Sequence, residues 1–168
     1  MWPDLKMEIS VERESLNYLL VMHHDLIVKC ATTPPDHIET SALSAMLHSF
    51  YTGIENLFKR VAVHLDQGMP QGEMWHIRLL ESMINPTPNR PIVISKELRD
   101  HLQGYLSFRH VFRHAYSFDL RWSKMSPLVL EAEKTLQWLC RELDQFTTDM
   151  DMRHTGDAHG DYEPANCR

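Results

Sequence analysis

The sequence lacks the features that would place it in a membrane or in an oxidising compartment. No apolar run approaches the roughly 20 residues that a membrane-spanning helix needs, and the opening residues, MWPDLKMEIS, have neither the basic region nor the apolar stretch of a signal peptide. The three cysteines, Cys30, Cys140 and Cys167, are far apart and form no Cys-x-x-Cys pair. This pattern argues against a disulfide framework and against a zinc knuckle. We therefore expect a cytoplasmic protein without a bound metal or cofactor.

Glycine is also scarce, with 6 residues in 168, and no segment alternates apolar and polar residues for long. The apolar residues recur instead at helical spacing, which predicts an all-α protein. A stretch with three prolines, residues 85–93, cannot be helical. Helices are expected over residues 7–29, 36–66 and 73–84, from Ser95 into the segment that begins at Phe108, and from Ser126-Pro127 to Met150. These elements predict an antiparallel bundle of four to five helices as one domain, residues 1–150. The polar, non-periodic tail, residues 151–168, is expected to be disordered.

The formal net charge of −6 argues against a protein that coats nucleic acid. Its distribution is uneven, because the window from Arg109 to Lys124 holds four basic residues and one acidic residue. That window is therefore +3, and the remainder of the chain is −9. A local basic patch on an acidic body can bind a polyanion at one place only.

The basic patch lies in the segment FRHVFRHAYSFDLR, residues 108–121. On a helix that continues from Leu98, both Arg109 and Tyr116 fall on the stripe meant for burial. An arginine there is costly unless a carboxylate pairs with it or its head reaches water. His114 lies roughly 140° around an ideal helix from Arg109. The two side chains can meet only if the helix distorts or if a second copy of the chain supplies one of them.

The residue types in this segment suit the cleavage of RNA without a metal. Histidine can take the proton of the 2′-hydroxyl near neutral pH. Arginine supplies a permanent, forked cation for the phosphate as charge develops on it. Aromatic side chains beside these cations can stack on unpaired bases.

The run Arg109-His110-Val111-Phe112-Arg113-His114-Ala115-Tyr116 resembles the signature of HEPN-domain ribonucleases. That signature is an arginine, four to six intervening residues and a histidine. A tyrosine two residues beyond the histidine is similar to the HepT group of toxin–antitoxin systems. The segment SFYTGIENLFKRVA, residues 49–62, also resembles the second helix of that group.

The resemblance implies a HEPN-like bundle that forms a homodimer, with Arg109 and His114 as the catalytic pair. The chain would be the toxin of a type VII-like pair, cleaving single-stranded regions of RNA, with transfer RNA as a candidate, to a 2′,3′-cyclic phosphate. Tyr116 would be the residue that a partner nucleotidyltransferase (MNT-type) antitoxin modifies with AMP to silence the toxin. The remaining basic residues of the segment are the RNA-binding candidates: His110, Arg113, Arg121 and Lys124.

Three alternatives accompany this interpretation. Many members of the group carry asparagine or another polar residue directly after the arginine, whereas this chain has His110 there, so either His110 or His114 could be the base. The tyrosine register favours His114. A non-catalytic helical module could use the same basic patch to hold a nucleotide or an acidic partner surface. The Glu-x-x-His pair of Glu73 and His76 lacks the second pair of a di-iron bundle and is interpreted as chance or as a helix-start carboxylate.

Overall fold

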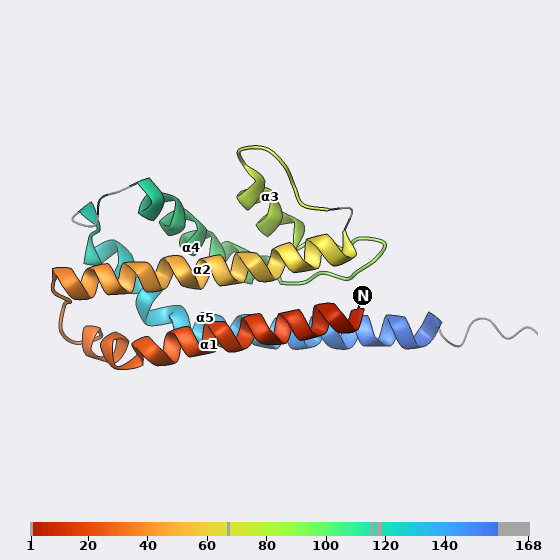
Figure 1. Ribbon diagram of the computed structural model, residues 1–168, viewed down its shortest axis with the longest axis horizontal. Coiled ribbons are helices and arrows are strands. Elements are labelled where there is room, and N and C mark those ends of the chain that lie inside the picture. The colour runs from red at the N-terminus through yellow and green to blue at the C-terminus, as the bar shows by residue number, and fades with distance from the viewer. Residues whose placement is uncertain (1, 67, 115, 117–118, 158–168) are drawn as a thin grey trace, which may run out of the picture.

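The computed structural model describes residues 2–66, 68–114, 116 and 119–157, and within these residues it contains helices and no strand (Figure 1). The helices are α1 (Trp2–Cys30), α2 (His37–Leu65), α3 (Trp75–Ser82), α4 (Lys96–His114) and α5 (Trp122–Asp157). The prediction of an all-α protein is confirmed.

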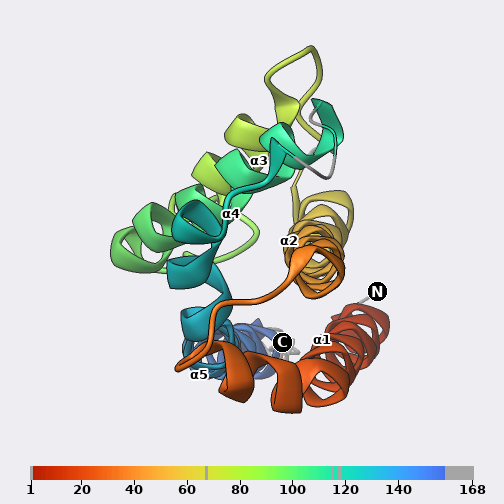
Figure 2. The same ribbon diagram turned by 90° about the vertical axis from the view of Figure 1, so that its left-hand side faces the viewer.

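The long helices form an antiparallel bundle with α2 at its centre. The chain direction reverses from α1 to α2 and again from α4 to α5 (Figure 1), and α2 lies between the α1–α5 pair and the layer of α3 and α4 (Figure 2). A central helix must be apolar on more than one face, and α2 buries residues all round, from Leu43 through Phe50 and Ile54 to Leu65. This arrangement confirms the predicted bundle.

The starts of α2 and α4 are capped by side chains at the positions where the sequence predicts these helices to begin. The side chain of Asp36 accepts hydrogen bonds from the backbone N–H groups of Ile38 and Glu39, both at 2.8 Å, and the Glu39 carboxylate accepts from the Asp36 N–H at 3.0 Å. This reciprocal pair is a capping box at the start of α2. Ser95 caps α4, because its hydroxyl oxygen accepts from the N–H of Leu98 at 3.1 Å.

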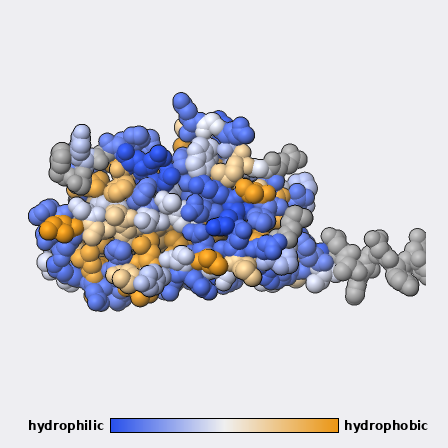
Figure 3. Space-filling model, viewed as in Figure 1, coloured by the Kyte–Doolittle hydropathy of each residue, from blue (hydrophilic) through white to orange (hydrophobic). Residues whose placement is uncertain are grey.

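The surface is mixed, with exposed apolar side chains on α3 (Ile77) and α4 (Val111) as well as on α1. Hydrophilic residues gather over α4 on the face drawn in Figure 3, whereas apolar patches lie over the lower layer. On α1 the exposed apolar side chains include Met7, Val11, Tyr18, Val21, Met22 and Val28. Among the described helices none is long and apolar enough to span a bilayer.

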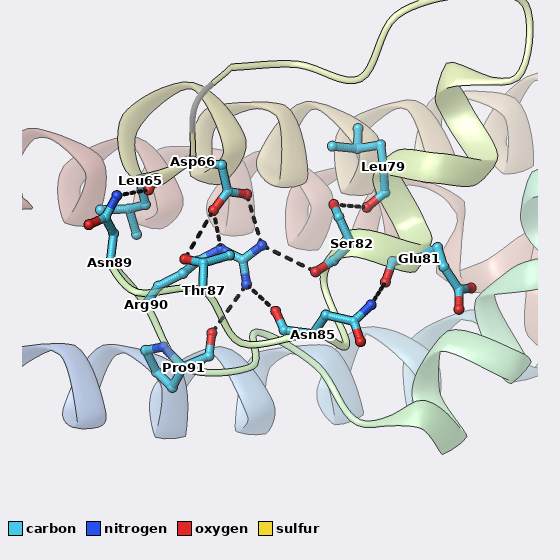
Figure 4. Close-up of polar contacts among 10 residues, drawn as sticks. All are labelled: Leu65, Asp66, Leu79, Glu81, Ser82, Asn85, Thr87, Asn89, Arg90 and Pro91. Atoms are coloured by element: carbon cyan, nitrogen blue, oxygen red, sulfur yellow. Dashed lines mark hydrogen bonds and ion pairs between the residues drawn. The ribbon is translucent and has the colours of Figure 1, made fainter.

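The loop after α3 is held by a single buried arginine (Figure 4). Arg90 is completely buried, and its Nε and Nη2 donate to the two carboxylate oxygens of Asp66 at 2.9 and 2.8 Å. Its remaining donor capacity goes to the backbone carbonyls of Asn85, Pro91 and Ser82, at 3.0 to 3.2 Å. Because Asp66 follows α2 and Ser82 ends α3, this network fixes the place of α3 against α2.

The outer helices are longer than the sequence predicts. α1 begins at Trp2 rather than near Met7, and α5 continues to Asp157 rather than ending at Met150, so the expectation of disorder is wrong for residues 151–157. The two ends support each other, because the Trp2 indole and Lys6 both donate to Asp151 at 2.7 Å. Residues 158–168 of the predicted tail lie outside the described residues.

The predicted start of the last helix at Ser126-Pro127 is also wrong. α5 begins at Trp122, and Pro127 lies inside its second turn. Met125 is 1 % exposed and its sulfur contacts the Ser44 hydroxyl of α2 at 3.6 Å. Burial of this extra turn against the core outweighs the hydrogen bond that proline cannot make.

Candidate functional site

Three helices meet at one buried carboxylate. Glu55 of α2 is 1 % exposed, and its Oε2 accepts a hydrogen bond from Nδ1 of His76 on α3 at 2.5 Å. Its Oε1 lies 3.2 Å from Nζ of Lys59 and 3.4 Å from Nη2 of Arg109 on α4. One acidic group therefore has three basic partners, which is the compensation that a buried charge requires.

Arg109 is paired with the carboxylate of Glu55, as an arginine on a buried helix face requires. The predicted position on the buried stripe is confirmed, since the side chain is only 11 % exposed. Its Nη1 lies 3.4 Å from both ring nitrogens of His76. One atom at equal distance from both nitrogens contacts the ring as a whole instead of donating to one lone pair. The guanidinium is thus held between the Glu55 carboxylate and the His76 ring, and its buried Nε has no hydrogen-bond partner within the described part of the chain.

An aromatic side chain covers the outer edge of this cluster. The Trp75 ring lies beside the His76 ring, with 3.5 Å between their centroids. Lys59 Nζ stands 4.9 Å from the Trp75 centroid, a cation–π distance. Lys59 is 32 % exposed, so the cluster opens to solvent on this side.

Beside the cluster runs a groove of about 490 Å³ between α3 and α4. Both members of the predicted catalytic pair line it, Arg109 at its buried wall and His114 at its exposed rim. The divergence of the two residues on the helix therefore does not keep them out of one groove. The other polar lining residues include Glu73, His76, Gln103, His110 and Arg113, and the rings of His110 and His114 have centroids 4.9 Å apart.

The predicted RNA-binding residues divide between two grooves. His110 and Arg113 line the groove just described, whereas Arg121 and Lys124 line a second groove of about 460 Å³ between α4 and the start of α5. Ser107 and Val111 border both grooves. The basic patch of the sequence is therefore two surfaces on either side of one helix.

Tyr116 does not share a helix face with Arg109, and that prediction is wrong. α4 ends at His114, so Tyr116 lies beyond the helix, where its side chain is 73 % exposed. The residues around it, 115 and 117–118, lie outside the described part of the chain.

A histidine of α2 packs against α4 without lining the groove. His48 of α2 stacks on Phe112 of α4, with ring centroids 4.8 Å apart and planes 24° from parallel. Burial lowers the pKa of His48, and the charges of Arg109 and Arg113 lower it further. Both effects disfavour the charged imidazolium, so this ring packs against Phe112 as a neutral aromatic group.

Glu55 and His76 are the site residues that the sequence did not reveal. Glu55 stands inside the segment 49–62 that resembles the family's second helix, four residues after Tyr51 and three before Phe58, both buried. An acidic residue on an apolar helix stripe is a signal that could have been followed. The sequence pattern places His76 only in the Glu-x-x-His pair with Glu73 and does not relate it to Glu55.

A family model described as HepT-like protein matches residues 42–150, from the first turns of α2 into α5, and covers Glu55, His76, Arg109 and His114. The chain belongs to the HepT-like family. This membership makes it a HEPN toxin of the HepT type, from a family associated with toxin–antitoxin systems and ribonuclease activity. Comparison of the HepT-like chain with curated proteins and with solved structures finds no match.

Proposed function

We propose that this HepT-like chain is an endoribonuclease toxin that cleaves single-stranded regions of RNA in the groove between α3 and α4. One observation carries the proposal: Arg109, His110, Arg113 and His114 line a single groove, in which Arg109 is held by a buried carboxylate. A phosphodiester fits such a surface, because two arginines offer forked donors and the histidines can move protons.

The proposed reaction needs no group beyond the chain and the RNA. His114 takes the proton of the 2′-hydroxyl, the 2′-oxygen bonds to phosphorus, and the bond from phosphorus to the 5′-oxygen breaks. The products are a 2′,3′-cyclic phosphate and a 5′-hydroxyl. Arg109 and Arg113 stabilise the charge that develops on the phosphoryl oxygens. His110, whose ring neighbours that of His114, is the alternative base.

RNA would reach this groove as an unpaired strand. A groove of about 490 Å³ has room for a nucleotide or two but not for a duplex. Exposed loops of transfer RNA are therefore a suitable substrate class. Arg121 and Lys124, in the neighbouring groove, would bind the phosphates of the flanking strand.

Two partners complete the proposal. A second copy of the chain would form a homodimer in which the two grooves face a shared cleft, and sedimentation at micromolar concentration tests this. A cognate nucleotidyltransferase antitoxin would silence the toxin by adding AMP to Tyr116, whose side chain is exposed as such a reaction requires.

The decisive experiment expresses the chain alone and follows growth and RNA integrity. The unchanged chain should arrest growth and shorten RNA, and His114→Ala should abolish both effects. His24→Asn is the control, since His24 pairs with Glu133 between α1 and α5, outside the groove. An unchanged chain that binds RNA but leaves it intact would instead support the non-catalytic module.

A further inference from the structure

We propose that His76, oriented by Glu55, is the general acid that protonates the 5′-oxygen as it leaves phosphorus. This inference rests on the function proposed above. That function assigns a base for the 2′-hydroxyl, but it leaves the departing oxygen without a proton donor. An alkoxide is a poor leaving group at neutral pH, so a second proton-transfer group is required.

The contact with Glu55 gives His76 a defined orientation. A carboxylate only accepts, so Nδ1 of His76 donates across the 2.5 Å to Oε2. Glu55 is 1 % exposed and cannot turn away into water. The ring is therefore fixed with Nε2 on the side away from Glu55, in the way that a buried carboxylate orients a catalytic histidine.

His76 reaches the same groove as the proposed base. Its side chain is 18 % exposed, and it lines the groove together with Arg109 and His114. It comes from α3, whereas His114 comes from the end of α4, so the two histidines approach the groove from different helices. Arg109 lies against the His76 ring, which places the phosphate-binding cation next to the proposed acid.

Charged side chains from several elements surround His76. Lys59 of α2 and Arg109 of α4 are the basic groups beside Glu55, and Arg113 lines the groove together with His110 and His114. Glu55 and Glu73 are the acidic groups, and Glu73 lines the groove. A bound phosphodiester would bring its negative charge beside Arg109 and His76, where the departing oxygen needs a proton donor.

The step balances without any further reactant. The proton on Nε2 of His76 passes to the 5′-oxygen as the bond from that oxygen to phosphorus breaks, and His76 is left neutral. The 2′-hydroxyl proton has passed to His114. Exchange with water then removes the added proton from His114 and supplies one to His76 before the next turnover.

A purely structural role for His76 is the competing explanation, because Glu55 needs a partner in any case. His76→Asn separates the two explanations. The amide nitrogen of asparagine can replace Nδ1 as the donor to Glu55, but an amide is too weak an acid to transfer a proton to the departing oxygen. His24→Asn is the matched control, since Nδ1 of His24 lies 2.7 Å from the carboxylate of Glu133, away from the groove.

The experiment compares two RNA dinucleotides, one with the natural 5′-oxygen and one with sulfur in its place. A thiolate leaves without protonation, because thiols ionise near a pKa of about 8.5. His76→Asn should slow cleavage of the oxygen substrate by roughly 10²- to 10⁴-fold and leave cleavage of the sulfur substrate close to that of the unchanged chain. His114→Ala should slow both, since both need the 2′-hydroxyl deprotonated.

Each other result has a definite meaning. If His76→Asn slows both substrates equally, or slows neither, His76 is not the acid, and the function proposed above still stands. An unchanged chain that cleaves neither substrate overturns both proposals. Thermal melting of His76→Asn beside His24→Asn shows whether a loss of rate follows from a loss of fold.

Discussion

The carboxylate of Glu55 accepts a hydrogen bond from His76 across 2.5 Å, in a place where only 1 % of the Glu55 side chain is exposed. This contact joins α2 to α3, and Arg109 brings α4 to the same carboxylate. The feature that shapes the groove is therefore also part of what holds these helices together. Substitutions here should change stability and activity by amounts that differ from one residue to the next.

Glu55→Gln should lower the free energy of unfolding by about 3 kcal/mol, the lower end of the cost of breaking a buried ion pair. Glutamine keeps the shape of glutamate but removes the charge that offsets Lys59 and Arg109. Urea denaturation followed by circular dichroism measures the change. Glu131→Gln is the control, because its pair with Lys134 is exposed and should contribute less than about 1 kcal/mol. Equal changes in the two variants would show that Glu55 is not the central partner of these cations.

Cleavage should proceed in the presence of a chelator and leave a 2′,3′-cyclic phosphate. The reason is chemical: His114 and His76 can supply both proton transfers, and Arg109 and Arg113 can supply the positive charge. Mass spectrometry of the shortened RNA identifies the ends. Products with a 5′-phosphate, or loss of cleavage in chelator that added Mg²⁺ restores, would contradict the mechanism.

Arg90→Met should destabilise the fold by about 3–5 kcal/mol, because it leaves the Asp66 carboxylate and several backbone carbonyls without their donor. Urea denaturation measures this as well. The control is Arg13→Met, whose partner Asp144 is 62 % exposed, and its effect should stay below about 1 kcal/mol. A small effect of Arg90→Met would mean that α3 is held by its apolar contacts alone.

Stability should fall as the pH drops below 6.5, the ordinary pKa of histidine, because the folded state lowers the pKa of His48. Between the lowered and the ordinary value the unfolded chain binds the extra proton, so acid favours unfolding there. His48→Phe keeps the stack on Phe112 and cannot titrate. The stability of this variant should therefore decrease less than that of the unchanged chain as the pH falls. The test compares urea midpoints of the two proteins between about pH 7.5 and pH 5.5. His24, whose pKa is raised by its hydrogen bond to Glu133, acts in the opposite sense but is present in both. Parallel curves of urea midpoint against pH would show that His48 does not contribute to the pH dependence of stability.

Local signals in the sequence predicted the features that depend on neighbouring residues. The start of α4 at Ser95, the break at residues 85–93 and the burial of Arg109 follow from composition and helical spacing. The start of α5 could not be predicted from such local signals, because Pro127 is tolerated inside the helix only through the packing of Met125 on α2.

The site needed long-range contacts that spacing does not contain. The helical projection showed that Arg109 requires a partner, but not that Glu55 supplies it from another helix. His76 reaches Glu55 only because α3 has a fixed place, which Arg90 and Asp66 maintain from outside the site. The end of α4 at His114 also decides where Tyr116 lies. No periodic pattern marks that end, since the apolar stripe continues to Phe112 and Tyr116.

The final prediction concerns Tyr116, the proposed acceptor of AMP. Its side chain is 73 % exposed just beyond the end of α4, two residues after His114. An added AMP would bring a phosphodiester and its negative charge to the edge of the basic groove, where Arg113 and His114 lie. RNA would then be excluded both by occupancy and by repulsion between like charges.

Co-expression with the cognate nucleotidyltransferase should add the mass of AMP to Tyr116 and abolish RNA cleavage. Tyr116→Phe should retain most of the cleavage, because its hydroxyl takes no part in the proposed proton transfers, yet it should escape the partner. Tyr18→Phe is the matched control, since Tyr18 is 66 % exposed on α1 and outside both grooves. It should be modified and silenced like the unchanged chain. If the partner still silences Tyr116→Phe in full, the regulatory modification lies on another residue, and charge brought to this edge of the groove is not what excludes RNA.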